Sequence, residues 1–191
     1  MRKTGIIKTF LPLILILLLS ASLCAEPREL TVLTLSDLHG QLEPFVTEEE
    51  NKTLKVGGIA RIASAVKKIK NANPGKALLF SSGDSLTGKY FLQFDGEAIF
   101  SAISLIGIDA ATLGNHEFDR GDEALSNALI YCNFPIIQSN LETKDNSSLK
   151  NSFKKFKIIE RNNIKIGIIG RHPTFPLSQA QVAILRLILI S

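Results

Sequence analysis

Short apolar runs alternate with amphipathic segments along most of the chain. The first run, Leu30–Ser36, is rich in apolar and β-branched residues and predicts a buried strand. Apolar side chains then recur at helical spacing from Ile59 to Ile69, with Arg61 and lysines on the other side, which predicts a helix. The segment 40–57 between them is polar, and we expect it to form an exposed loop.

The alternation continues to about residue 170. Apolar runs of strand length occur at Ala77–Ser82, Asp109–Gly114 and Pro135–Ser139. Helical patterns lie between them, at Glu97–Ile106 and in the stripe that runs from Leu125 to Cys132. The runs Phe153–Glu160 and Ile164–Gly170 flank a short polar turn, which indicates a hairpin. Strands that alternate with helices predict an α/β domain with a largely parallel sheet.

Polar side chains follow three of the predicted strands. Asp37 and His39 come after the first, Asp84 after the second, and Asn115 and His116 after the third. Ligands of parallel sheets gather beyond the carboxyl ends of the strands, so we expect these residues to meet at one edge. Carboxylate, imidazole and amide oxygen groups all bind divalent cations. The order of these residues therefore predicts a metal site at that edge.

Such a site would suit the hydrolysis of a phosphate ester. The Asp84 carboxylate could bridge two cations, and a pair of cations roughly 3.5–4 Å apart clamps a phosphate and activates water. His116 could donate a proton there, and Asp119 is close enough in sequence to hydrogen-bond it. Taken singly, these residues have ordinary roles: Asp84 caps a segment, Asn115 makes a turn, and Asp119 is the N-cap of the next helix.

Four strings carry a family resemblance: Ser36-Asp37-Leu38-His39-Gly40, Gly57-Gly58-Ile59-Ala60-Arg61, Ser82-Gly83-Asp84 and Gly114-Asn115-His116-Glu117-Phe118-Asp119. From about Leu30 to Gly170 the chain resembles the calcineurin-like metallophosphoesterases, and within them the bacterial 5'-nucleotidase/UDP-sugar hydrolase group. The resemblance implies two divalent metal ions (Mn, Zn, Co or Mg) and nucleotide substrates outside the cytoplasm. It also implies the site roles, with metal ligands at Asp37, His39, Asp84 and Asn115 and a catalytic dyad of His116 and Asp119.

The resemblance ends after Gly170. Family members take further histidines from later segments, whereas His172 is the one histidine here outside the matched strings, and we expect it at the surface. We therefore interpret 25–170 as the N-terminal part of a metallophosphoesterase domain with an incomplete metal site. The tail, 171–191, diverges, which suggests a truncated or frameshifted copy. Its apolar run Val182–Ile190 has no assigned partner and could form a strand or a helix.

The N-terminus has the pattern of an export signal. Arg2, Lys3 and Lys8 precede an apolar run, Phe10–Leu19, and small residues follow it. That run is shorter than the roughly 20 residues of a membrane span. We predict a signal peptide over residues 1–24 and a periplasmic or cell-surface location. An uncleaved membrane anchor and a lipoprotein attached through Cys24 are the alternatives.

Charge and cysteine content narrow the class of protein further. The chain has a net charge of +4 from 22 basic and 18 acidic residues, but three of the basic residues lie in the predicted signal peptide. The near-neutral remainder, with Lys67, Lys68 and Lys70 on the wet side of a helix, argues against nucleic-acid binding. Cys132 would have no disulfide partner and should pack as a small apolar side chain.

The function that these observations favour is metal-dependent hydrolysis of phosphate esters, with a 5'-nucleotide as the small-molecule substrate. We expect reduced or no activity in this short chain. Two alternatives stay open. One is a non-catalytic exported remnant of the fold. The other is a phosphoesterase that acts on cyclic phosphodiesters or on other phosphate or sulfate esters.

Overall fold

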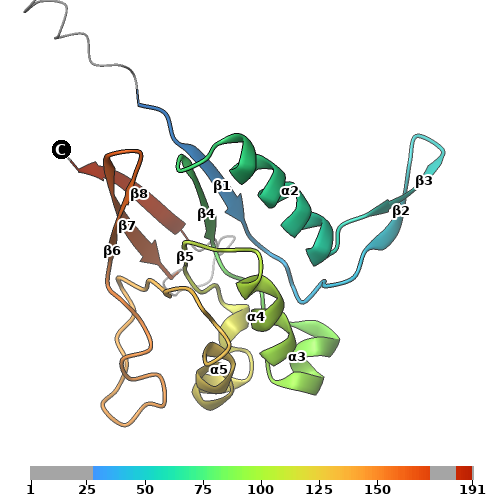
Figure 1. Ribbon diagram of the computed structural model, residues 1–191. Helices are drawn as coiled ribbons and strands as arrows, with labels where there is room; N and C mark the ends of the chain where they lie inside the picture. Colours follow the sequence, from blue (N-terminus) through green and yellow to red (C-terminus); the bar gives the residue numbers. More distant parts are fainter. Residues whose placement is uncertain (1–27, 173–183, 191) are drawn as a thin grey trace, which may run out of the picture.

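A computed structural model of the chain describes residues 28–172 and 184–190 (Figure 1). Three parallel strands form the central sheet, in the order β1-β4-β5: β1 (Thr31–Leu35), β4 (Ala77–Ser81) and β5 (Ala110–Ala111). Thr31 pairs with Ala77, and this register continues to Leu35 and Ser81. The two strands therefore end side by side at their carboxyl ends.

The central strand β4 is buried along its whole length. Leu79 packs into a core formed with the helices, while Leu78 and Phe80 pack on the other face against Ile166 and Ile168. A parallel strand covered on both faces explains the continuous apolar run in the sequence. The helices of the described part are α2 (Ile59–Ala72), α3 (Gly88–Phe94), α4 (Glu97–Ser104), α5 (Gly121–Leu129) and the 3-10 turn η1 (His116–Phe118).

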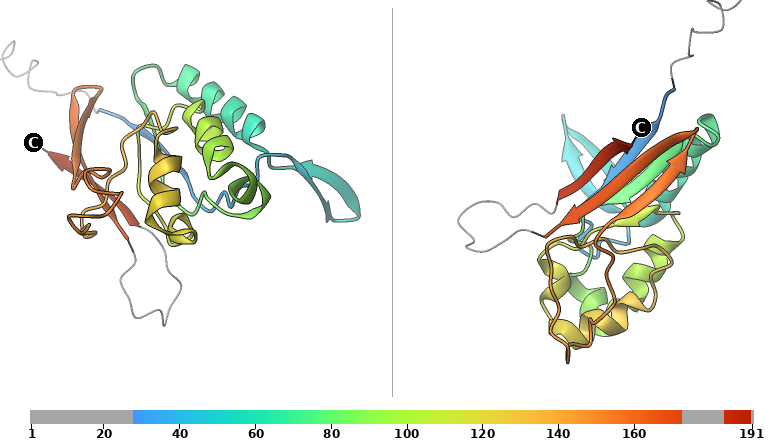
Figure 2. Two further views of the ribbon diagram at one scale, coloured as in Figure 1. Left: turned by 90° about the horizontal axis from the view of Figure 1, so that it is seen from below. Right: turned by 90° about the vertical axis from the view of Figure 1, so that its left-hand side faces the viewer.

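A second, antiparallel sheet covers the face of the central sheet opposite α2 and α4. It contains β6 (Lys157–Arg161), β7 (Ile164–Arg171) and β8 (Ile184–Ile190), with β7 in the middle. The right-hand view of Figure 2 shows its strands in front of β1 and β4. The predicted hairpin is thus confirmed. Within the apolar run of the tail, which the pattern alone left open, Ile184–Ile190 forms β8 and pairs with β7 from Lys165 to Arg171.

The predicted polar loop at 40–57 is wrong, because most of it forms a hairpin. The strands β2 (Phe45–Glu49) and β3 (Lys52–Val56) pair antiparallel and project from the rest of the molecule (Figure 1). Nearly all of their side chains are exposed, so they lack the apolar run that marks a buried strand. Glu50 and Asn51 form the turn with φ of 50° and 61°, the left-handed conformation that two-residue hairpins favour.

Five other features differ from the expectations. The strand β1 is half-buried rather than buried, with Val32 41% exposed, because in the described structure it lies at the edge of its sheet. The predicted strand at 109–114 is limited to the two residues of β5, and the one at 135–139 to bridges at Ile136 and Ile137. Helix α3 was not predicted, and α5 ends before Cys132. Cys132 still packs against the core, and burial raises the pKa of its thiol to about 12.

The Asp109 carboxylate connects helix α2, the central sheet and the antiparallel sheet. Its Oδ2 accepts the backbone N–H of Leu79 in β4 at 2.9 Å and lies 3.4 Å from Nζ of Lys70 in α2. Its Oδ1 accepts a hydrogen bond of 2.8 Å from Arg161 in β6. Lys70 was expected on the wet side of its helix, but its side chain is only 30% exposed because it reaches this carboxylate.

Asp109→Ala is expected to lower the free energy of unfolding by about 1–3 kcal/mol, because it leaves a buried backbone N–H without an acceptor. Chemical denaturation of the chain measures this loss. Asp145→Ala is the matched control, since Asp145 is fully exposed and pairs only with Lys150. We expect that variant to stay within about 0.5 kcal/mol of the parent. Equal losses in the two variants would contradict the connecting role of Asp109.

Candidate metal centre

The loops that follow β1 and β4 stay hydrogen-bonded beyond the strands. The backbone N–H of Asp37 donates to the Gly83 carbonyl at 3.1 Å, and that of His39 donates to the Asp84 carbonyl at 3.0 Å. This pairing brings the side chains of Asp37, His39 and Asp84 together, and one potential ligand atom of each lies within 4.8 Å of the others. Asp84 is buried, whereas Asp37 and His39 are exposed.

All three of these residues have left-handed backbone conformations. The φ angles are 51° at Asp37, 49° at His39 and 52° at Asp84. Such angles are uncommon outside glycine, and each costs on the order of 1 kcal/mol. Strained backbone of this kind is concentrated at functional sites, where the surrounding structure maintains it.

The loop after β5 joins the same edge of the sheet. The backbone N–H of His116 donates to Oδ1 of Asp84 at 3.0 Å. The two loops approach so closely that a Cβ atom on Gly83, whose φ is +93°, would lie 2.2 Å from the backbone nitrogen of Gly114. Asn115 lies between Gly114 and His116 on this loop and is half-buried. The carboxyl ends of all three central strands therefore deliver their polar residues to one edge.

His116 and Asp119 are in contact. Nδ1 of His116 lies 2.8 Å from Oδ2 of Asp119, and the His116 ring centroid is 4.9 Å from that of His39. The Asp119 hydrogen bond raises the pKa of His116, an effect that burial partly opposes. Helix α5 has Arg120 rather than Asp119 at its N-cap, so Asp119 is available to the histidine.

Glu117 is a buried acid whose importance the sequence reasoning missed. The residue is only 1% exposed, and its carboxylate accepts backbone N–H groups from both ligand-bearing loops. Burial raises the pKa of this carboxyl, while the four N–H donors lower it. Its partners are main-chain groups, which no sequence pattern identifies. The one available signal was its place between His116 and Phe118 in a matched string.

His172 does not join this group. It is half-buried rather than at the surface, because its ring packs edge-on against Phe118 with the centroids 5.2 Å apart. Its backbone N–H donates to Oδ1 of Asn140 at 2.9 Å.

The donor set at the edge of the central sheet suits a divalent cation. Two carboxylates and one imidazole within 4.8 Å supply the hard oxygen and borderline nitrogen ligands that Mn²⁺, Zn²⁺ and similar ions accept. Among the described residues this is the one such group of His, Cys, Asp and Glu side chains. The predicted ligands Asp37, His39 and Asp84 thus fit one cation, and Asn115 lies on the neighbouring loop.

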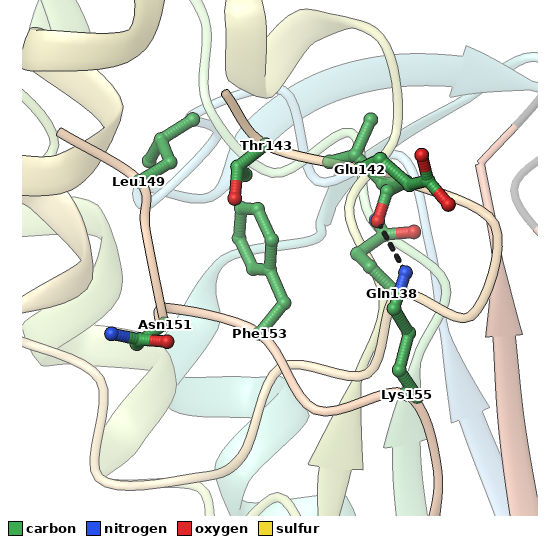
Figure 3. Close-up of a pocket in the computed structure, with 8 residues that line it drawn as sticks. Gln138, Glu142, Thr143, Leu149, Asn151, Phe153 and Lys155 are labelled. Carbon is green, nitrogen blue, oxygen red and sulfur yellow. Dashed lines mark hydrogen bonds between the residues drawn. The ribbon is translucent and has the colours of Figure 1, made fainter. Parts of the chain in front are cut away.

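A separate pocket of about 360 Å³ lies in the loops between Gln138 and Lys155 (Figure 3). Lys155 crosses one side of it and donates to the Leu141 carbonyl at 2.7 Å. None of the predicted metal ligands lines this pocket. Gln138, which lines the pocket, donates from Nε2 to the Leu113 carbonyl at 3.1 Å.

The fold, with metal-type ligands at the carboxyl ends of its strands, is that of a metallophosphoesterase, and comparison with known proteins agrees. The chain belongs to the calcineurin-like phosphoesterase family, whose model matches residues 30–180. It is 36% identical to a bovine (Bos taurus) 5'-nucleotidase over 169 residues, which are 83% of this chain. It is 34% identical to an NAD 5'-nucleotidase of Haemophilus influenzae over 149 residues, which are 74% of this chain.

Solved structures agree with these relatives. The Haemophilus influenzae NAD nucleotidase superposes with a TM-score of 0.71 at 30% identity over 75% of this chain. A 5'-nucleotidase precursor from Thermus thermophilus gives 0.69 at 30% identity. The chain spans only 29% of the bovine protein and 26% of the Haemophilus structure. None of the helices in the described part of the chain has the length and apolar character that crossing a bilayer requires.

Proposed function

We propose that this chain forms part of a site for metal-dependent hydrolysis of phosphate monoesters, with 5'-nucleotides as substrates. The observation that carries the proposal is the presence, at one edge of the sheet, of the Asp37–His39–Asp84 group beside the His116–Asp119 pair. The relatives named as 5'-nucleotidases support the choice of substrate.

The residues divide the work by their chemistry. Asp37, His39 and Asp84 would hold one divalent cation, and Asp84 and Asn115 would be ligands of a second one. A bound cation supplies Lewis-acid activation of the phosphate and a more acidic water. Asp119 binds Nδ1 of His116, which fixes the ring and leaves Nε2 as the nitrogen that can give a proton to the leaving oxygen.

Two further points are part of the proposal. We place the protein outside the cytoplasm, and the support is the basic and apolar pattern of residues 1–24.

We also expect two cations in the active form. Asp84 and Asn115 give a second cation only two ligands from the predicted set, so we expect it to bind weakly to this chain.

Phosphate release from AMP by the chain in the presence of Mn²⁺ tests the function. We expect slow phosphate release from AMP that EDTA abolishes, and no opening of a cyclic phosphodiester to its monoester. Conversion of the diester to the monoester without phosphate release from AMP would replace the nucleotidase proposal with a diesterase. Mn²⁺ binding without hydrolysis of either substrate would assign the chain to the non-catalytic alternative.

A further inference from the structure

We propose that Glu117 is a positioning residue that holds two ligand-bearing loops together, so that Asp84 and Asn115 can serve the same metal centre. This inference deepens the proposed function and rests on it for its consequence. The contact on which it stands is independent of any metal. The carboxylate of Glu117 lies between the loop after β4 and the loop after β5, and binds the main chain of both.

The hydrogen bonds of Glu117 are complete. Oε1 accepts the N–H groups of Ser85 at 2.6 Å and Leu86 at 3.1 Å. Oε2 accepts those of Asp84 at 2.9 Å and Gly114 at 2.7 Å. An ionised carboxylate has about four acceptor positions and no donor, so it satisfies all four groups. A glutamine amide has one acceptor oxygen and would turn its NH₂ group toward two of the N–H donors.

The N–H groups of these loops need such an acceptor, because the backbone pairing with the loop after β1 uses the carbonyls of residues 83–85 and not their N–H groups. Backbone N–H groups buried without an acceptor are strongly unfavourable, and those at 84–86 and 114 have left the strand ladders that end at Ser81 and Ala111. Asp84 also has a left-handed backbone, and Gly83 touches Gly114. Without Glu117 these four N–H groups would lose their acceptor, and the close approach would rest on fewer contacts, among them the bond from the His116 N–H to Oδ1 of Asp84.

The role is one of positioning rather than catalysis. Glu117 is 1% exposed, so a substrate cannot reach its carboxylate. Glu117 acts on the metal centre by fixing the backbone of Asp84. The side chain of Asp84 in turn accepts the N–H of His116 at Oδ1. Residues that orient metal ligands typically contribute about 10–100-fold to metal affinity.

The test compares the parent chain with Glu117→Gln and Glu117→Ala by hydrogen–deuterium exchange without metal and by calorimetric titration with Mn²⁺. We expect the amides of 84–86 and 114 to exchange at least about tenfold faster in both variants, while those of β7 stay protected. We expect Mn²⁺ affinity to fall about 10–100-fold, less for Gln than for Ala. The control is Ile103→Val, a mild core change in α4 that lowers stability and leaves all four hydrogen bonds of Glu117 in place.

The outcomes separate this inference from the proposed function. Unchanged exchange at 84–86 and 114, or Mn²⁺ affinity that falls no more than in Ile103→Val, would overturn the positioning role even if the parent hydrolyses AMP. Faster exchange with weaker Mn²⁺ binding would support the role even if the parent hydrolyses nothing. If the alanine variant does not fold, the glutamine variant of nearly equal volume decides. Loss of the whole fold in both variants would assign Glu117 to general stability and overturn the proposal.

Discussion

His116→Ala is expected to lower kcat for AMP about 10²–10⁴-fold, the range that a positioned general acid supplies. Mn²⁺ affinity should stay close to that of the parent, because the His116 ring lies beside the metal group without being one of its three members. Steady-state phosphate release together with Mn²⁺ titration measures both quantities. A large loss of Mn²⁺ affinity with unchanged kcat would show instead that His116 is a metal ligand.

Asp119 should act on the same step through the ring. It raises the pKa of His116, so the imidazolium form persists to higher pH, and activity that needs this form is lost as the pH rises through that pKa. Asp119→Asn should therefore move the alkaline limb of the pH–rate profile to lower pH. Asp122→Asn, an exposed acid in the first turn of α5, is the matched control and should leave the profile unchanged.

Asp84→Asn is expected to reduce Mn²⁺ affinity more than about 100-fold. Loss of a residue that only orients a metal ligand typically costs about 10–100-fold, whereas this substitution removes a charged ligand itself. The asparagine oxygen can still accept the N–H of His116, so the loop should keep its shape. Mn²⁺ at a hundred times its dissociation constant stabilises a protein by about 2.7 kcal/mol, and the variant should lose this gain.

Thermal unfolding with and without Mn²⁺ measures the effect of Asp84→Asn. Without metal the variant should be as stable as the parent or slightly more so, because the substitution removes one of two like charges, at Asp37 and Asp84, whose ligand atoms lie within 4.8 Å of each other. Asp95→Asn is the control, since Asp95 is exposed and pairs with Arg120. Equal Mn²⁺ stabilisation of Asp84→Asn and the parent would remove Asp84 from the proposed site.

The parts of the fold that could be predicted are those in which burial determines the sequence. The run at Ala77–Ser82 is apolar because β4 is covered on both faces, and the stripe from Ile59 to Ile69 is apolar because one side of α2 packs on the sheet. The hairpin β2–β3 was missed because nearly all of its side chains are exposed, so burial imposes no apolar run on its sequence. Its strands are held by backbone pairing and by the left-handed turn at Glu50 and Asn51.

The candidate site also has parts that the sequence predicted and parts that it did not. The convergence of Asp37, Asp84 and Asn115 follows from parallel strands whose ends share an edge, so the order of the motifs was enough to predict it. The role of Glu117 was not predicted, because its four partners are backbone N–H groups, which every residue except proline has. The half-burial of His172 depends on a ring contact with Phe118, which is so distant in the sequence that a local pattern carries no information about it.

The left-handed backbone at Asp37, His39 and Asp84 limits how this centre could be redesigned for another cation. Aspartate, asparagine and histidine tolerate that conformation better than most side chains, whereas β-branched residues are strongly disfavoured. Exchanging a ligand here for glutamate or cysteine would alter the loop as well as the coordination. A change of metal preference is therefore easier to engineer at Asn115, where the loop has ordinary right-handed φ and ψ values of −76° and −33°.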